Sequence, residues 1–208
     1  MKRYRINEIF YSVQGEGYFA CTAAVFIRFS GCNLKCPFCD TDFKEYKEMT
    51  SQEILAEVIK ADYGRCMNIV VTGGEPTLQW DEELSEVLRG ADYFVAMESN
   101  GTRPVDGKID WLTISPKAQW VKNAQIAPVN FAEGVCDEIK VVIDEKTPLE
   151  LVAQIPDHFV GTPHLYVQPC DTGFVKPNAE IMKRCVEFIK MFPSWSISLQ
   201  TQKILKVR

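Results

Sequence analysis

Strand-like runs alternate with helix-like segments along most of this chain, and this alternation limits the fold more than any other feature. The runs are rich in β-branched and aromatic residues, which favours strands over helices. They occupy residues 6–10, 24–29, 69–72, 93–97, 111–115, 138–143, 165–168 and 196–199. Because right-handed βαβ units generate parallel pairing, we expect an α/β fold with a mainly parallel sheet. Helices are few and short for this many strands, so we expect an abbreviated, incomplete (β/α) barrel.

Capping patterns locate the expected helices. Thr50 and Glu53 form a capping box at the start of the first helix. Its apolar stripe consists of Ile54, Leu55, Val58 and Ile59. Asp81 is expected to cap a second helix, and a third is expected to begin after Pro177. A short helix is also expected around residues 148–155.

Composition narrows the class of function. The chain has 208 residues, 46% hydrophobic and 25% charged, which suits one globular domain spanning residues 1–208. A net charge of −5 argues against a basic face for nucleic acid and favours a small-molecule substrate. No run reaches the roughly 20 apolar residues of a membrane helix, and the N-terminus lacks the apolar segment of a signal peptide. We therefore expect a cytoplasmic protein with no membrane partner.

The chain has eight cysteines, and three of them are clustered. Cys32, Cys36 and Cys39 follow directly after the predicted strand 24–29, with C-x3-C-x2-C spacing. Three thiolates on one loop can bind three irons of a four-iron cluster, which leaves the fourth iron open to the amine and carboxylate of S-adenosylmethionine. Structural zinc is the weaker alternative, because it usually needs a second cysteine pair, and the histidines His158 and His164 lie far downstream.

This loop resembles the signature of the radical S-adenosylmethionine superfamily, in which an aromatic residue precedes the last cysteine. Phe38 supplies that residue, and the resemblance implies that its backbone contacts the adenine. Gly73, Gly74 and Glu75 follow the predicted strand 69–72 and match the superfamily motif that binds the methionine amine. Adjacent glycines allow close backbone approach, and a carboxylate can accept hydrogen bonds from an ammonium group. Such a turn by itself is often only a turn.

Four groups of residues together resemble the 7-carboxy-7-deazaguanine synthase family, in the family's order. They are residues 8–17; 26–34 with 39–41; 71–78 with 98–101 and 115–117; and 168–171 with 199–203. The resemblance implies a lyase that converts 6-carboxy-5,6,7,8-tetrahydropterin to 7-carboxy-7-deazaguanine with loss of ammonia. It implies that a 5′-deoxyadenosyl radical takes hydrogen from C6 of the pterin, so the cofactors rather than protein side chains carry the radical chemistry. Gln202 and Cys21 depart from the family, which commonly has His and Gly there.

The resemblance also implies which residues bind each ligand. For S-adenosylmethionine these are Phe38, Cys39, Asp40, Gly73, Gly74, Glu75, Ser99, Ser115, Pro116, Lys117, Gln168, Pro169, Cys170 and Asp171. For the pterin they are Val13, Gln14, Gly15, Glu16, Arg28 and Thr72. Arg28 suits the substrate carboxylate because a guanidinium binds it bidentately, and Glu16 suits the guanidine-like edge of the ring. By residue type alone, the alternative for Arg28 is a surface strand residue in an ion pair.

The residues after the last cysteine, Asp40 and Thr41, imply a magnesium site. In the family-like arrangement the Thr41 hydroxyl binds Mg²⁺, and the substrate and water supply the other oxygen ligands. Asp40 is expected to contact the cofactor through its backbone, although its carboxylate could reach the ion instead. The expected partners are an electron donor such as flavodoxin or ferredoxin and a second copy in a homodimer.

Two other functions are compatible with part of the sequence. An activating enzyme that acts on a partner protein would share the cluster loop and the turn at Gly73 and Gly74, but would have no need for residues 14–17 or Arg28. A non-enzymatic iron–sulfur or zinc-binding protein would need only the cysteines. Cofactor cleavage separates the enzymes from the scaffold, and turnover of the carboxypterin separates the two enzymes.

Overall fold

The computed structural model describes residues 2–37, 39, 45–117, 136–161 and 163–207. Its strands are β1 (Tyr4–Val13), β2 (Ala23–Phe29), β3 (Lys47–Met49), β4 (Asn68–Gly73), β5 (Phe94–Ser99), β6 (Trp111–Ile114), β7 (Glu138–Ile143), β8 (His164–Pro169) and β9 (Trp195–Ile197). Within these residues they form one nine-stranded sheet in the order β3-β1-β2-β4-β5-β6-β7-β8-β9. β1 is antiparallel to β2 and β3, and every pairing from β2 to β9 is parallel. The prediction of a mainly parallel sheet is confirmed.

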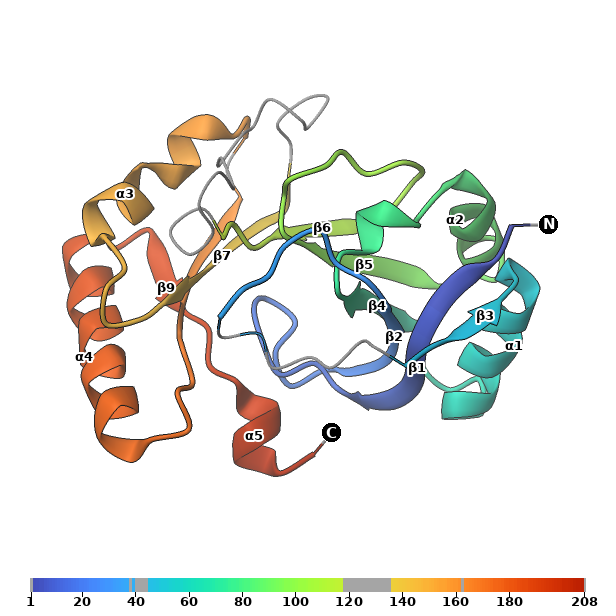
Figure 1. The fold of residues 1–208 in the computed structure, drawn as a ribbon, viewed down its shortest axis with the longest axis horizontal. Coiled ribbons are helices and arrows are strands. Elements are labelled where there is room, and N and C mark those ends of the chain that lie inside the picture. Colours follow the sequence, from blue (N-terminus) through green and yellow to red (C-terminus); the bar gives the residue numbers. More distant parts are fainter. Residues whose placement is uncertain (1, 38, 40–44, 118–135, 162, 208) are drawn as a thin grey trace.

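Helices flank a curved sheet, and the last of them lies at the cavity inside its curve. They are α1 (Ser51–Asp62), α2 (Glu82–Arg89), α3 (Leu149–Gln154), α4 (Val175–Met191) and α5 (Thr201–Leu205), with short 3-10 helices η1 (Pro76–Leu78) and η3 (Ile155–His158). Figure 1 shows α1 and α2 beside one end of the sheet and α3 and α4 beside the other. Among the described strands β3 and β9 are the two edges, so the sheet curves without closing. This is the predicted incomplete (β/α) barrel.

The predicted helix starts are confirmed where side chains cap them. The hydroxyl of Thr50 accepts from the amide of Glu53 over 3.2 Å, and the Glu53 carboxylate accepts from the Thr50 amide over 2.7 Å. Asp81 caps α2 by accepting from the Leu84 amide over 3.1 Å. Each cap satisfies an amide that has no partner within the helix, which stabilises the helix by about 1 kcal/mol.

Several details differ from the prediction. Helix α4 begins at Val175, because Pro177 then lies in the first turn, where its missing amide has no cost. The last strand ends at Ile197, and residues of the predicted strand 196–199 instead lead into α5. The polar edge strand β3 was not predicted. Ile59 is 45% exposed, so it does not belong to the buried stripe of α1.

The strands place alternate side chains on opposite faces of the sheet. On β2, Val25, Ile27 and Phe29 are fully buried in the core with residues of α1 and α2. Phe26 and Arg28 face the other way and line a cavity inside the curve of the sheet. Burying each large aliphatic side chain contributes about 1.5–3 kcal/mol, so the helix-facing residues supply much of the stability. The inner face remains available for polar side chains.

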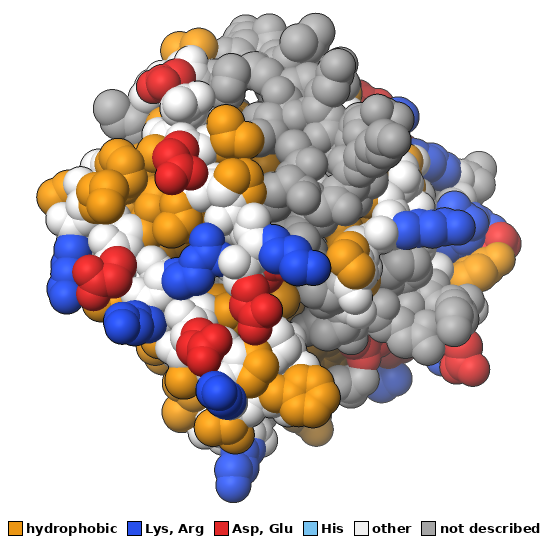
Figure 2. Space-filling model, turned by 60° about the vertical axis from the view of Figure 1, so that its left-hand side comes forward, with side chains coloured by type: hydrophobic (Ala, Val, Ile, Leu, Met, Phe, Trp, Pro, Cys, Tyr) orange, Lys and Arg blue, Asp and Glu red, His pale blue; other side chains and the backbone are white. Residues whose placement is uncertain are grey.

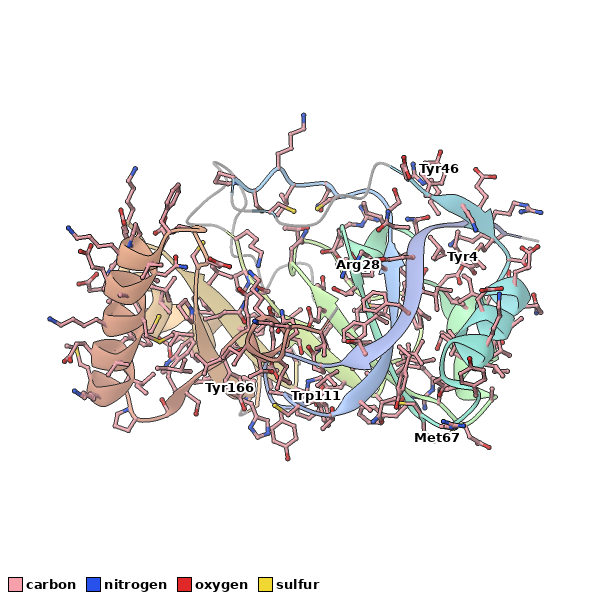
Figure 3. The ribbon with its side chains drawn as sticks, turned by 90° about the horizontal axis from the view of Figure 1, so that it is seen from below. Tyr4, Arg28, Tyr46, Met67, Trp111 and Tyr166 are labelled. Atoms are coloured by element: carbon pink, nitrogen blue, oxygen red, sulfur yellow. The ribbon has the colours of Figure 1, made fainter. Side chains whose placement is uncertain are left out.

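The amino ends and the carboxyl ends of the strands carry different side chains. Trp111, at the first position of β6, stacks on Tyr18 with ring centroids 5.0 Å apart and contacts Phe19 edge-on. Figure 3 shows Met67, Trp111 and Tyr166 on one side of the sheet, at one end of the strands, and Arg28 nearer the other end. The aromatic cluster therefore lies at the amino ends of the strands.

None of the described helices is long and apolar enough to cross a bilayer.

Candidate active site

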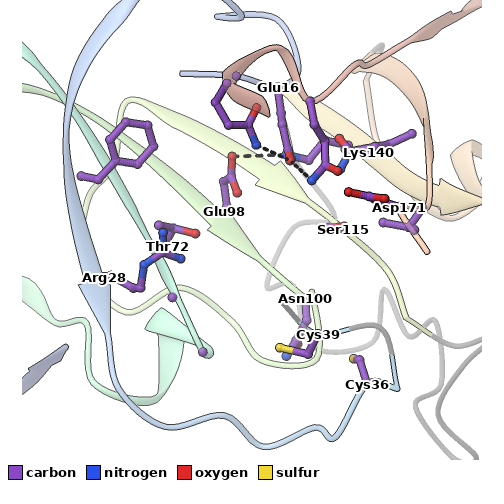
Figure 4. A pocket seen from close by; sticks show the side chains of 18 of the residues that line it. Glu16, Arg28, Cys36, Cys39, Thr72, Glu98, Asn100, Ser115, Lys140 and Asp171 are labelled. Carbon is purple, nitrogen blue, oxygen red and sulfur yellow. Dashed lines mark hydrogen bonds and ion pairs between the residues drawn. The ribbon is translucent and has the colours of Figure 1, made fainter. Parts of the chain in front are cut away.

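A cavity of about 610 Å³ lies at the carboxyl ends of the strands. Because most strands are parallel, the segments that leave β2, β4, β5, β6 and β8 meet at this edge, as in other α/β folds. The end of β1 and the segment before α5 also line the cavity. Figure 4 shows thiols on one side of the cavity and a group of charged residues on another.

The three cysteines of the motif all line this cavity. The turn after β4 fixes the start of their loop: the Glu75 amide donates to the Gly31 carbonyl over 2.9 Å, and the Gly74 amide donates to the Phe29 carbonyl over 3.0 Å. A Cβ at Gly74 would lie 1.9 Å from the Gly31 carbonyl oxygen, so only glycine fits there. A further contact joins the Asn33 amide group to the Thr102 hydroxyl over 2.7 Å.

The three thiols are suitable ligands for iron. Burial raises the pKa of the Cys32 and Cys36 thiols, and for Cys36 the nearby Lys117 ammonium opposes that effect. Within the described residues no three His, Cys, Asp or Glu side chains form a preassembled metal site. Cys32, Cys36 and Cys39 nevertheless face one cavity from one short loop, and thiolate sulfur is the ligand that iron–sulfur clusters use. The donor set therefore fits a cluster better than a hard cation.

Glu75 does not line the cavity, although Gly73 and Gly74 do. Its side chain is fully buried and accepts from the hydroxyls of Thr77 and Ser99, over 2.6 and 2.9 Å, and from the Asn100 amide over 2.7 Å. It also accepts from the Thr77 amide over 3.1 Å. The carboxylate therefore joins the turn after β4 to the turn after β5.

Most other residues assigned to S-adenosylmethionine reach the same cavity. Its lining includes Cys39, Gly73, Gly74, Ser99, Ser115, Lys117, Gln168, Pro169, Cys170 and Asp171. Pro116 is not part of the lining, and Phe38, Asp40 and Thr41 lie outside the described residues. Lys117 donates to the Ser115 hydroxyl, and burial, followed by repulsion from Lys140, lowers the pKa of Lys117.

All of the residues assigned to the pterin also line the cavity, namely Val13, Gln14, Gly15, Glu16, Arg28 and Thr72. Nε of Arg28 donates to Oε1 of Glu8 over 2.8 Å, and the guanidinium lies 5.7 Å from the centre of the Phe10 ring. Both neighbours come from β1, which pairs with β2. These contacts fix the plane of the guanidinium beside the cavity.

A buried lysine that the sequence did not single out lies in the same cavity. Nζ of Lys140 donates to Oε2 of Glu16 over 2.6 Å and to Oε1 of Glu98 over 3.2 Å. Burial by itself would raise the pKa of the Glu16 carboxyl, but Lys140 and the amides of Gln200 and Gln202 outweigh it and lower the pKa. Glu16 and Lys140 are therefore both charged at neutral pH.

One signal for Lys140 was present in the sequence. All six residues of β7 are buried, and Ile139, Val141 and Ile143 join the core. By period-two alternation, Glu138, Lys140 and Val142 must face the inside of the barrel. A lysine at an inward position of an otherwise apolar strand needs a buried partner. Neither that partner nor the contribution of Glu98 could be identified before the strands were arranged.

Comparison with known proteins agrees with this geometry. The profile described as the Radical SAM superfamily matches residues 26–118. A 7-carboxy-7-deazaguanine synthase from Bacteroides thetaiotaomicron is 43% identical over 204 residues, with 98% of each chain covered. One from Burkholderia multivorans is 35% identical over 225 residues, which covers 98% of this chain and 99% of that protein. The chain belongs to the 7-carboxy-7-deazaguanine synthase family.

The fold agrees with this assignment. The crystal structure of QueE from Escherichia coli matches with a TM-score of 0.76 and 24% identity, covering 95% of this chain and 93% of that one. Membership of the 7-carboxy-7-deazaguanine synthase family confirms the predicted family, the incomplete barrel and a radical S-adenosylmethionine enzyme with a [4Fe-4S] cluster. Nothing in these matches favours an activating enzyme or a zinc-binding scaffold.

Proposed function

We infer that the chain is a radical S-adenosylmethionine lyase, which converts 6-carboxy-5,6,7,8-tetrahydropterin to 7-carboxy-7-deazaguanine with loss of ammonia. Within the family, one observation carries this function. A single cavity contains Cys32, Cys36 and Cys39 together with a cation, Arg28, and a carboxylate, Glu16. A flat ring with one carboxylate and several N–H donors needs such groups, and a radical enzyme must bring that ring close to its cluster.

We propose that Cys32, Cys36 and Cys39 bind three irons of the cluster, and that the fourth iron is left for S-adenosylmethionine. When bound, the cluster and S-adenosylmethionine supply a 5′-deoxyadenosyl radical that takes hydrogen from C6 of the substrate. Support comes from the thiols that line the cavity and from the absence of a fourth cysteine in the motif. Cys170 lines the cavity as well, and we assign it to the cofactor pocket rather than to the cluster.

The assignments to S-adenosylmethionine are Phe38, Cys39, Asp40, Gly73, Gly74, Glu75, Ser99, Ser115, Pro116, Lys117, Gln168, Pro169, Cys170 and Asp171. Backbone groups of Gly73 and Gly74 suit the methionine end because no side chain obstructs them. Glu75 acts here through Ser99 and Asn100, since its carboxylate already accepts their hydrogen bonds. Lys203 donates to Asp171 over 2.7 Å, which fixes that carboxylate at the edge of the pocket.

The substrate assignments are Val13, Gln14, Gly15, Glu16, Arg28 and Thr72. Arg28 binds the substrate carboxylate, and the contact of its Nε with Glu8 orients the guanidinium. Glu16 and the backbone carbonyls near it accept from the guanidine-like edge of the ring. Arg28 lies on β2 and Glu16 lies in the segment after β1, and both face one cavity, so they can bind opposite ends of one flat molecule.

We also propose a magnesium ion at Thr41 that binds together with the substrate, whose carboxylate and ring oxygen complete the ligand set with water. Asp40 contributes either a backbone contact to the cofactor or a carboxylate to the ion. Hard oxygen ligands from the substrate would explain why the sequence has no cluster of carboxylates for this metal.

We propose that residues 1–208 form one domain, since the described strands share one sheet. All eight cysteines lie in the described residues and are free, which supports a cytoplasmic location where thiols stay reduced. A flavodoxin or ferredoxin would supply the electron, and a second copy would complete a homodimer. On the face shown in Figure 2, basic and acidic side chains are interspersed, which supports the absence of a nucleic-acid partner.

One assay tests the function. The anaerobically reconstituted enzyme is incubated with S-adenosylmethionine, magnesium, a reductant and the carboxytetrahydropterin, and the product is identified by mass and absorbance. We expect 7-carboxy-7-deazaguanine and ammonia in equal amounts. Cleavage of S-adenosylmethionine without this product would contradict the lyase function and favour a protein substrate, and no cleavage by a fully loaded cluster would favour a non-enzymatic role.

A further inference from the structure

We propose that Lys140 is a positioning residue, which fixes the carboxylates of Glu16 and Glu98 as acceptors for the donor edge of the substrate ring. This inference rests on the proposed function, because the ring is taken to be a pterin whose 2-amino-4-oxo edge carries N–H donors. Lys140 acts through the two carboxylates and not by contact with the reacting carbon. Glu98 thereby becomes a determinant of substrate recognition beside Glu16.

The geometry joins three distant parts of the chain. Lys140 lies in β7, Glu98 lies in β5, and Glu16 follows β1. The side chain of Lys140 is 4% exposed, and its Nζ contacts one oxygen of each carboxylate, as the dashed lines in Figure 4 show. A lysine can donate three hydrogen bonds, so both contacts can form at once. The register of the sheet, and not a flexible surface loop, sets the position of this ammonium group.

The contacts leave acceptor capacity directed at the cavity. Oε1 of Glu98 accepts from Gln14 over 3.1 Å as well as from Lys140, whereas no donor among the described residues reaches Oε2 of Glu98. On Glu16, Oε2 accepts from Lys140 and Oε1 accepts from Gln200 over 2.9 Å. Both carboxylates line the cavity, and the side chain of Glu98 is 25% exposed. Oε2 of Glu98 is therefore an open acceptor at the wall of the cavity.

The charge of Lys140 is needed for this arrangement. Burial lowers the pKa of Lys140, but Glu16, Glu98 and Glu138 outweigh it and raise the pKa overall. Burial raises the pKa of Glu138, and Lys117 is the other cation that faces Lys140. Glu16 and Glu98 contact the same nitrogen, so without it two carboxylates would lie close together. Like charges at short range disfavour ionisation, and one carboxylate would then take up a proton.

The test compares Lys140→Met, which removes the charge at similar size, with Lys140→Arg, which keeps it. The affinity for 6-carboxy-5,6,7,8-tetrahydropterin is measured on the cluster-loaded enzyme with S-adenosylmethionine and no reductant. The affinity for the 2-oxo analogue of this pterin, which presents a different pattern of hydrogen-bond donors, is measured in parallel. We expect Lys140→Met to bind the pterin about 10- to 100-fold more weakly, as for loss of a hydrogen bond to a charged group, and Lys140→Arg to retain most of the affinity. Lys190→Met, on an exposed helix position, is the matched control and should bind like the parent.

A role limited to folding would not change two further readouts. In Lys140→Met, the pterin affinity should rise with pH as the protonated carboxylate ionises, and the preference for the pterin over the 2-oxo analogue should shrink. If Lys140→Met does not fold, the double variant Lys140→Met/Glu16→Gln removes the close like charges, and it should fold without regaining affinity. If Lys140→Met, or the double variant in its place, binds the pterin with the affinity and the pH dependence of the parent, the proposal is overturned. A parent enzyme that binds the pterin but forms no product would contradict the lyase function instead.

Discussion

The two ends of the cavity are built in different ways. At the cluster end, Cys32, Cys36 and Cys39 come from one loop. Hydrogen bonds with neighbouring turns keep this loop in place. At the charged end, Glu16 and Lys140 are 124 positions apart in the chain and meet only because the sheet curves. Iron can draw its thiolate ligands together when it binds, whereas ionic acceptors for a neutral ring must be positioned beforehand. The cluster end therefore depends on residue identity, and the charged end depends on the fold.

Loss of any cluster thiol should have the largest effect. Replacing Cys32, Cys36 or Cys39 by Ala removes a proposed iron ligand, so we expect loss of the cluster absorbance and of all cleavage of S-adenosylmethionine. Iron content and anaerobic absorbance spectra measure this. The matched controls are the buried cysteines Cys66 and Cys185, whose Ala variants should keep the cluster even if they are less stable. Loss of iron in Cys66→Ala would show that the cluster is not confined to one loop.

Arg28→Lys tests a side chain that lies between the two ends. Glu8 orients the guanidinium through Nε, and a lysine ammonium cannot reproduce the planar pair of donors. We expect pterin binding to weaken by about 10- to 100-fold with unchanged cluster absorbance, measured by titration of the loaded enzyme. Arg3→Lys changes an exposed arginine and serves as the control. If Arg28→Lys bound the pterin as tightly as the parent, another residue would have to bind the substrate carboxylate.

Thr41→Val tests whether the magnesium site belongs to the cluster end. Valine has the same shape without the hydroxyl, so it should lose most of the stimulation of turnover by magnesium, about several-fold, and keep the cluster. Thr41→Ser keeps a hydroxyl and should respond to magnesium like the parent. Turnover is measured against magnesium concentration at saturating substrate. An equal response in Thr41→Val and the parent would assign Thr41 a purely structural role.

The sequence predicted those features that depend on neighbouring residues. The capping box at Thr50 and the cap at Asp81 each involve residues a few positions apart, and their local geometry follows from residue type. The inward and outward faces of β2 also follow from period-two alternation. The strand and helix pattern was therefore sufficient for the fold class and for the edge at which the cavity lies.

The features that the sequence did not predict depend on tertiary contacts. Glu98 belongs to a stretch that resembles the family, but its contact with Lys140 follows only when β5 and β7 are placed on either side of β6, with their inward residues facing one cavity. The same is true of Glu75, whose carboxylate joins two turns and is not exposed to the cavity. The short helix α5 has weak local signals; Gln200 before it contacts Glu16, and Thr201 at its start contacts Gly15. Partners brought together by the sheet cannot be derived from spacing along the chain.

The smallest expected effect concerns the acid stability of the charged end. The folded-state pKa of Glu16 is lowered to about 2 from its ordinary value of 4.5; burial opposes this shift, while the ammonium of Lys140 drives it. A carboxyl with a lowered pKa stabilises the fold fully above its unfolded value and loses that contribution as pH falls through the folded value. The parent should therefore be more stable than Glu16→Gln above about pH 4.5, and the difference should vanish toward about pH 2.

Urea unfolding followed by circular dichroism measures that difference on iron-free protein, because protonation of the cluster thiolates would add a second pH dependence. Glu180→Gln, an exposed change on α4, is the control and should track the parent at every pH. The core between the sheet and the helices contains none of the proposed cluster ligands. Unfolding of this core can therefore be measured without iron, and the effect of Glu16 on it can be compared between the parent and the variant. A difference between the parent and Glu16→Gln that stays constant from about pH 6 to about pH 2 would mean that the contact with Lys140 adds no net stability. The charged end would then be maintained for substrate binding alone.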